Sequence, residues 1–413
     1  MRVFVVSALV AVVVTAGCAE GDETSSLAGT EPAVAFPASH GLARSPAAAD
    51  APIEALVAGW NDAGFDLLRT QPAAQNVVFS PASIGHALLM AEAAADEPTR
   101  RAISAAFGLP EAAHEAWNRV DQELAAAQSE QVTVTLADRI WPRLDIEPQQ
   151  AWIDLLATHH GADVVPLDFA GDPDASRDSI NTWVSERTED LIPALLSDGV
   201  ITPATVLVLT DTVYFKADWE RPFGKYGPVD GTFTTLDGEQ VPTSFMRELE
   251  LTDRRGTGDG FVGAEIPYAG GEYSMLVLVP EEGRYDELLA RLDQTLLEQI
   301  DRSFTTGPYE LLLPKWDDDY QMDLMPWLQG LGVSPGSYPS ISPDASLGAA
   351  VHAADITVDE IGTVAAAATA LAFEVSGPPE PELSVAADRP FIYLIRHRLT
   401  GLVLFTGQVT DPR

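Results

Sequence analysis

The chain has 413 residues, of which 46% are hydrophobic and 21% charged, a composition typical of a globular protein with a sizeable core. Its 62 acidic residues outnumber its 24 basic ones and give a formal net charge of −38. Such an acidic surface argues against nucleic acid as a partner, and equally against a heparin site, because anionic polymers are bound by Lys and Arg.

The first residues have the pattern of an export signal. Arg2 precedes an apolar run at 3–14, which is too short for a membrane span of about 20 residues, and small residues at 15–17 lead to Cys18. Small residues ending at a cysteine resemble the cleavage box of bacterial lipoproteins, although Thr15 stands where that box usually has Leu. This resemblance implies a signal over 1–18 and lipidation of Cys18. An ordinary signal peptide is the alternative.

The predicted location follows from this pattern. We expect an exported protein that is either anchored in the outer membrane by its N-terminal lipid or extracellular, with no other membrane contact. Cys18 is the only cysteine, so the folded body contains no disulfide.

The organisation of the chain changes near residue 52. Residues 19–51 are rich in Ala, Ser, Gly, Pro and acids without periodicity, which predicts a flexible tether. Residues 52–413 are globular in pattern and predicted to form one domain. Helical spacing occurs over 53–69 and twice within 80–107. Strands are predicted at 132–141, 161–169, 206–215, 273–280 and 309–314. Early helices and late strands favour an α+β fold.

A series of spaced motifs runs through this domain. They are NVVFSPASI at 76–84, INTWV at 180–184, WERPF at 219–223, LPKW at 313–316, DRPF at 388–391 and LFTGQV at 404–409. Between strand-like residues at 356–358 and the DRPF motif lies the run EIGTVAAAAT at 360–369, whose small side chains suit a strand that slides into a sheet.

In this order the motifs resemble the serpin family, large suicide inhibitors of proteases. The resemblance implies helices packed around a large mixed main sheet and smaller sheets, with an exposed reactive loop at about 360–387. A serine protease would attack this loop and form an acyl-enzyme, and the cleaved hinge would insert into the main sheet as a new strand. Such a protein is not an enzyme and needs no cofactor. Its expected partner is a serine protease, and a monomer is expected.

The resemblance also assigns residues of the loop. The implied hinge comprises Glu360, Gly362, Thr363, Ala365, Ala366, Ala367, Ala368 and Thr369. The family spacing of 17 residues places the reactive bond at Ser376–Gly377, and a loop one residue shorter places it at Val375–Ser376. A small residue before the bond favours an elastase-like or subtilisin-like target. Trypsin-like targets are disfavoured because 361–387 contains no Lys or Arg.

Further positions match the polar shutter beneath the main sheet and the breach at its end. These are Ser80, Ser83, Asp211, His352 and, at the breach, Trp219. Asp211 stands where the family usually has an amide, which predicts a charge-assisted pair with His352.

Three other patterns in the sequence suggest different functions. GVSPG at 332–336 fits the G-x-S-x-G hydrolase elbow, but a helix is predicted before it at 322–331 where the elbow needs a strand. His159-His160 and the three acids at 317–319 lack metal-site spacing, so no metal site is predicted. The main alternative function is a non-inhibitory serpin that acts as a binding protein.

Overall fold

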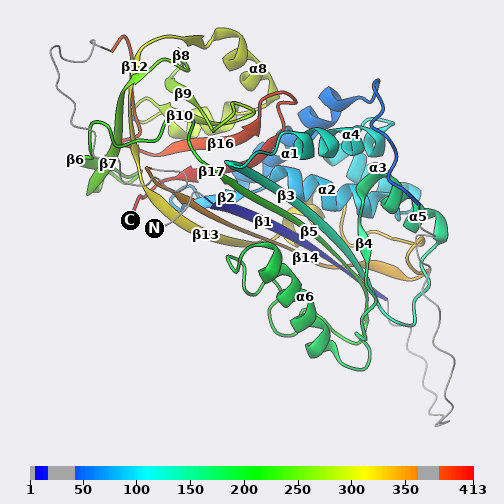
Figure 1. The fold of residues 1–413 in the computed structure, drawn as a ribbon. Coiled ribbons are helices and arrows are strands. Elements are labelled where there is room, and N and C mark those ends of the chain that lie inside the picture. Colours follow the sequence, from blue (N-terminus) through cyan, green and yellow to red (C-terminus); the bar gives the residue numbers. More distant parts are fainter. Residues whose placement is uncertain (1–4, 17–41, 361–380) are drawn as a thin grey trace, which may run out of the picture.

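The computed structural model describes residues 5–16, 42–360 and 381–413 (Figure 1). Its strands form three sheets. The six-stranded sheet has the order β13 (Trp316–Asp323), β14 (Ala345–Val358), β1 (Val5–Ala16), β5 (Thr205–Ala217), β3 (Val132–Pro142) and β4 (Asp163–Val164). The seven-stranded sheet has the order β11 (Thr305–Thr306), β8 (Arg254–Gly258), β9 (Phe261–Pro267), β10 (Tyr273–Pro280), β16 (Phe391–His397), β17 (Val403–Val409) and β2 (Val77–Phe79). The four-stranded sheet has the order β15 (Ser384–Ala386), β12 (Tyr309–Pro314), β7 (Gln240–Leu251) and β6 (Val229–Thr234).

The helices fall into an early group and a late group. The early ones are α1 (Ile53–Thr70), α2 (Pro81–Glu92), α3 (Glu97–Ala106), α4 (Ala113–Ala126), α5 (Gln150–Leu155), the π-helical turn η1 (Leu156–His160) and α6 (Pro173–Arg187). The late ones are α7 (Tyr285–Arg291), α8 (Gln294–Ser303) and α9 (Met325–Gly330).

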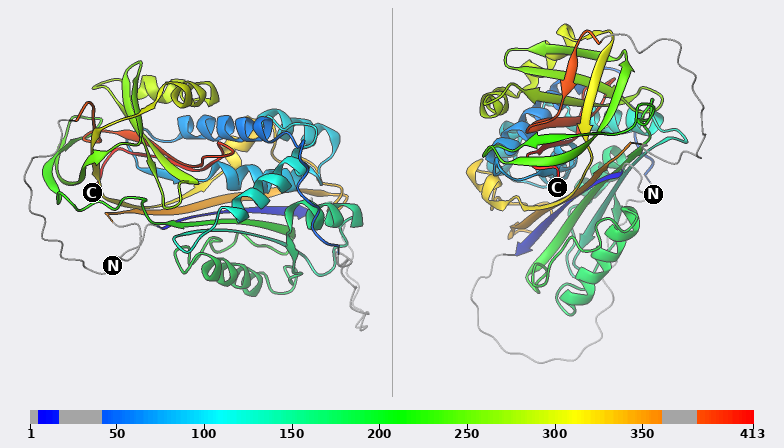
Figure 2. Two further views of the ribbon diagram at one scale, coloured as in Figure 1. Left: turned by 45° about the horizontal axis from the view of Figure 1, so that its top comes forward. Right: turned by 90° about the vertical axis from the view of Figure 1, so that its left-hand side faces the viewer.

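The six-stranded sheet is covered on both faces (Figures 1 and 2). Helices α1, α2 and α4 lie on one face, and α6 lies on the other. Under α6, Ile180 and Trp183 join a separate apolar cluster that includes Val208 of β5 and Ala353 of β14. A strand between β5 and β14 is therefore shielded from water by apolar side chains on either side.

Helix α2 is buried along almost its whole length. The Ser80 hydroxyl caps its N-terminus by accepting from Ser83 N, and Pro81 opens its first turn. Every residue from Pro81 to Ala91 is buried, as expected for a helix that is apolar all round and lies between a sheet and other helices. Gly85 permits the close packing of α1, because a Cβ there would lie 2.5 Å from the Trp60 ring.

Most expected elements are confirmed, and three differ. The strand expected over 161–169 is reduced to Asp163–Val164 at the edge of the sheet. The helix expected over 322–331 is only Met325–Gly330, since 322 and 323 belong to β13. The three acids at 317–319, for which the sequence favours a solvated turn over a calcium site, also lie in β13, an edge strand whose outer residues can be charged without entering the core.

The N-terminal region differs from expectation as well. The last part of the expected tether is held against the body, because Arg44 forms an ion pair with Asp121 and Ser45 N donates to Thr158 O at 2.8 Å. The apolar run expected as an export signal forms β1 inside the six-stranded sheet. Within the described ranges, no helix is long and apolar enough to cross a membrane.

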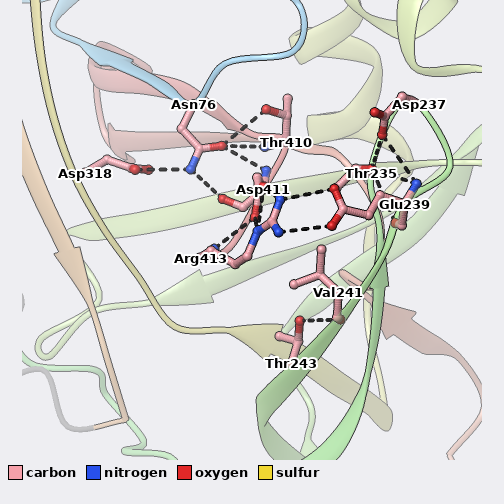
Figure 3. Close-up of polar contacts among 10 residues, drawn as sticks. All are labelled: Asn76, Thr235, Asp237, Glu239, Val241, Thr243, Asp318, Thr410, Asp411 and Arg413. Atoms are coloured by element: carbon pink, nitrogen blue, oxygen red, sulfur yellow. Dashed lines mark hydrogen bonds and ion pairs between the residues drawn. The ribbon is translucent and has the colours of Figure 1, made fainter.

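The C-terminus is fastened by the side chain of Asn76 (Figure 3). Its amide oxygen accepts from Thr410 N at 2.7 Å and Asp411 N at 3.0 Å, while its amide nitrogen donates to Asp411 O at 2.6 Å and Asp318 Oδ1 at 3.1 Å. One half-buried side chain therefore joins the entry to β2, the edge strand β13 and the chain after β17.

Replacing Asn76 by Ala is expected to lower the free energy of unfolding by about 2–3 kcal/mol, because buried backbone groups lose their partners. Urea denaturation of the wild-type and variant proteins measures this difference. Arg413→Ala is the control, since its exposed ion pair with Glu239 contributes at most about 1 kcal/mol. A change at Asn76 no larger than at Arg413 would contradict the fastening role.

Asp318 makes the stability sensitive to pH. Its pKa is raised to about 6, mainly by burial and also by the nearby acids Asp317, Asp319 and Asp411, while the hydrogen bond from Asn76 acts to lower it. A carboxyl whose pKa is raised on folding contributes stability below about pH 4 that is lost as the pH rises through about 6.

Asp318→Asn is therefore expected to be more stable than wild type by about 1–2 kcal/mol at pH 8, and equal to it near pH 4. Urea melts at the two pH values measure the difference. An equal difference at both pH values would show that the ionisation of Asp318 is not its cause.

Candidate functional site

The central feature of the six-stranded sheet is the position between β5 and β14, which we call the insertion position. In this structure β1 lies there and pairs with both neighbours in antiparallel register, Val10 lying opposite Asp211 and His352 (Figure 1). The pairing runs from Val5, opposite Thr357 and Lys216, to Ala16, opposite Ala345. Strands β5 and β14 are consequently parallel to each other. The sheet thus accepts a complete additional strand at this position.

One end of the insertion position is held by the breach residue Trp219. Its indole nitrogen donates to Asp359 O at 3.0 Å, and its ring stacks on Tyr268 with centroids 4.6 Å apart. Phe223 N donates to Glu360 O at 2.8 Å, and Lys315 lies 3.1 Å from the Glu360 carboxylate. The chain that leaves β14 toward the expected hinge is therefore fixed at this end of the sheet.

The expected shutter residues meet beneath the middle of the sheet. Ser80 N donates to His352 Nε2 at 3.0 Å, and the Ser83 hydroxyl donates to Asp211 O at 3.4 Å. These four residues are buried, and they link α2 to both strands that flank the insertion position. Since His352 Nε2 accepts a hydrogen bond, the neutral ring carries its proton on Nδ1.

The expected pair between Asp211 and His352 is not formed. The Asp211 carboxylate contacts His86 Nδ1 of α2 instead, because Asp211 and His352 lie on opposite sides of β1 while His86 lies below β5. His86 Nδ1 is also 3.5 Å from Asp138 Oδ1, and Asp138 is the register partner of Asp211 on β3.

This buried group was missed by the sequence analysis, although acids at 138 and 211 inside two apolar strands were a usable signal. Burial acts to lower the pKa of His86, but Asp138 and Asp211 outweigh it and raise that pKa. Burial raises the pKa of Asp138, with His86 opposing. His160, for which the sequence predicts no metal site, lies against His86 and is buried, and burial lowers its pKa.

Several expected site residues lie outside the described residues. These are Cys18, Gly362, Thr363, Ala365, Ala366, Ala367, Ala368, Thr369, Val375, Ser376 and Gly377. Of the hinge, only Glu360 is placed. Ser334, the serine of the GVSPG motif, follows the six-residue helix α9. Its hydroxyl contacts Met325 Sδ at 3.8 Å rather than a general base, so its surroundings do not activate it as a nucleophile.

Comparisons with known proteins agree with this geometry. The family model described as Serpin (serine protease inhibitor) matches residues 58–412. An uncharacterized serpin-like protein of Methanosarcina acetivorans is 29% identical over 82% of this chain and 82% of its own length. Plasminogen activator inhibitor 1 of Bos taurus is 30% identical over 82% of this chain and 87% of its own.

Among solved structures, the fold is similar to that of the thermophilic serpin Tengpin in its native state. The TM-score is 0.77 at 23% identity, covering 90% of this chain and 98% of Tengpin. The expected fold is therefore confirmed, and the chain belongs to the serpin family of serine protease inhibitors.

Proposed function

We propose that this chain is an irreversible suicide inhibitor of serine proteases with a small apolar specificity pocket, elastase-like or subtilisin-like. The observation that carries the proposal is the insertion position, which takes a full antiparallel strand between β5 and β14. Strand β14 leads at Glu360 directly into the segment whose small residues suit such a strand.

The dimensions support the proposal. Strand β1 fills the insertion position with 12 residues, about 40 Å at roughly 3.3 Å per residue. The 14 residues from Gly362 to Val375 span about 46 Å, enough to replace it. On an inserted strand Leu371 and Phe373 would share one face, and each would contribute about 1.5–3 kcal/mol when buried.

The chemistry begins with attack of the protease serine hydroxyl on the carbonyl carbon of Ser376. The peptide bond to Gly377 breaks, the Gly377 amine takes up a proton and leaves, and an ester joins Ser376 to the protease. Insertion of the hinge then carries the ester-linked protease away before water hydrolyses the ester. The inhibitor supplies stored conformational energy and no catalytic group.

The remainder of the chain stays with the body after cleavage. Strand β15 pairs with β12, and β16 and β17 lie inside the seven-stranded sheet with every residue buried. The cut ends can therefore separate without unfolding the protein.

Residues 5–16 and the cleaved hinge would compete for the same position. While β1 occupies it, the hinge has no place to insert, and a protease would cut the loop and dissociate. Removal of the N-terminal segment would free the insertion position, so export and activation would coincide.

The test mixes a protein of residues 19–413 with elastase, subtilisin, chymotrypsin and trypsin, and looks for a complex that survives denaturation. The expected result is a complex with elastase or subtilisin, together with a C-terminal peptide beginning at Gly377 or Ser376 that separates only on denaturation. Cleavage without a complex for every protease would favour the non-inhibitory binding protein instead.

We also propose that the protein is exported and anchored through lipid on Cys18. This proposal is supported by the sequence pattern at 2–18, in which a basic residue, an apolar run and small residues lead to Cys18. In bacterial cells given labelled fatty acid, the wild-type chain should become labelled and Cys18→Ser should not. Labelling of both, or of neither, would contradict the lipid anchor.

A further inference from the structure

Three metal-ligating side chains meet beneath the six-stranded sheet, outside the inhibitory loop. His86 comes from α2, Asp138 from β3 and Asp211 from β5, and we call them the His86 cluster. One ligand atom from each lies within 4.8 Å of the others. Their side chains are 1%, 8% and 3% exposed, respectively. This inference does not depend on the proposed function.

Without a bound cation, the cluster must hold protons to balance its two buried carboxylates. Asp138 and Asp211 face each other across neighbouring strands, and the Oδ1 atoms of both carboxylates are buried without a hydrogen-bond partner among the described residues. An unpaired carboxylate oxygen is costly in the interior, and a buried charge is normally paired or bound to a metal. A singly charged His86 would compensate one carboxylate, and the other would have to hold a proton or meet a second cation.

A relay of histidines orients the His86 ring. His86 Nε2 lies 2.8 Å from His160 Nδ1, His160 Nε2 lies 2.9 Å from His114 Nδ1, and His114 Nε2 lies 3.5 Å from the Glu92 carboxylate. If His114 Nε2 donates to the Glu92 carboxylate, the neutral His114 ring accepts at Nδ1 from His160 Nε2. The neutral His160 ring in turn accepts at Nδ1 from His86 Nε2. His86 Nε2 then donates to His160, so a metal ion could replace the proton that the two carboxylates favour on His86 Nδ1.

We propose that the His86 cluster binds one divalent transition-metal ion through His86 Nδ1 and the Asp138 and Asp211 carboxylates. Imidazole with carboxylates suits Zn²⁺ and its first-row neighbours, whereas Mg²⁺ and Ca²⁺ prefer oxygen ligands alone. A ligating histidine usually donates its second ring nitrogen to a neighbour, as His86 does to His160. A divalent ion would neutralise both carboxylates and bind the two carboxylate oxygens that lack a hydrogen bond.

The site has nearly the right size and an entrance. The ligand atoms all lie within 4.8 Å of one another. Bonds of about 2.1 Å set neighbouring ligand atoms of one ion about 3–4 Å apart, so the direct contact between His86 Nδ1 and the Asp211 carboxylate must open to admit the ion. A cavity of about 400 Å³ is lined by Asp138 and His160 and offers room for water ligands. The bound ion would join α2, β3 and β5, and β5 is one edge of the insertion position.

The experiment uses the protein of residues 19–413, freed of metal by a chelator that is then removed. Calorimetric titration with ZnCl₂ should give one tight site per chain. Titration with CoCl₂ should give the visible absorption of a low-symmetry Co²⁺ site. Zn²⁺ should also raise the melting temperature, because a ligand of the folded state stabilises it.

The variants decide whether this cluster is the site. Asp211→Asn should abolish the tight binding and the Co²⁺ spectrum. Asp138→Asn should have the same effect, and it serves as the test if Asp211→Asn does not fold. His160→Ala should weaken binding by about 10–100-fold, as expected for loss of the residue that orients a ligand. Asp318→Asn, which changes a partly buried carboxyl far from the cluster in the fold, is the matched control and should leave binding unchanged.

Two outcomes would overturn the proposal. Absence of a tight site in the folded wild-type protein would mean that a proton on His86, rather than a metal, occupies this position. Binding that survives both Asp138→Asn and Asp211→Asn would place the ion elsewhere on the acidic surface.

Discussion

Replacing Thr363 by Arg is expected to convert the protein from an inhibitor into a substrate. In the proposed mechanism the hinge takes the place of β1, between β5 and β14, with α2 on one face of the sheet and α6 on the other (Figure 1). An Arg there would have to leave water without a charged partner, at a cost of several kcal/mol. Insertion would slow while hydrolysis of the ester continued, so the number of inhibitor molecules needed per protease should rise at least about tenfold.

The measurement is the stoichiometry of inhibition, with the cleavage site determined in parallel. Glu380→Arg is the matched control, because it adds the same side chain beyond the reactive bond, in the part of the loop that does not insert. Thr363→Ser should behave as wild type. If Thr363→Arg kept the wild-type stoichiometry, the hinge would not enter the sheet at that residue.

The second large effect concerns the N-terminal segment. A protein of residues 1–413 that keeps its first 18 residues is expected to form the protease complex at least about tenfold less than the protein of residues 19–413. Only about 1.4 kcal/mol of preference for β1 in the insertion position produces that factor. The two proteins are compared at equal concentration against the same protease, by the yield of denaturant-stable complex.

A proline in β1 provides the control. Val10→Pro removes a backbone donor from the middle of a central strand and should dislodge it, restoring complex formation in the 1–413 protein. Equal yields from 1–413 and 19–413 would show that β1 does not compete with the loop.

The elements that the sequence predicted well are those with long, regular patterns. Helix α1 and strand β5 were expected within two residues of their ends, because periodicity and continuous apolar runs are strong local signals. The elements that were predicted with wrong bounds are short. Strand β4 has two residues at a sheet edge, and α9 ends after six, so tertiary contacts decide both. The run at 5–16 has the same apolar composition whether it serves as a signal or as a strand.

The candidate site was predictable in part. The motif around Ser80 and Ser83, together with His352, indicated the shutter because family spacing carries those positions. The partner of Asp211 was not predictable, since His86 is 125 residues away and only the packing of α2 below β5 brings them together. Likewise nothing local in His159-His160 shows which ring faces inward. Residue identity indicated the chemistry, and the fold determined the pairs.

The most direct test of loop insertion is hydrogen exchange in the protein of residues 19–413, before and after a protease cuts the reactive loop. Insertion predicts that backbone amides of 363–375 exchange quickly in the intact protein and become strongly protected after cleavage, and that the facing amides of β5 and β14 exchange more slowly as well. Fast exchange of 363–375 after cleavage, with β5 and β14 unchanged, would contradict insertion between these strands and with it the proposed inhibitory mechanism.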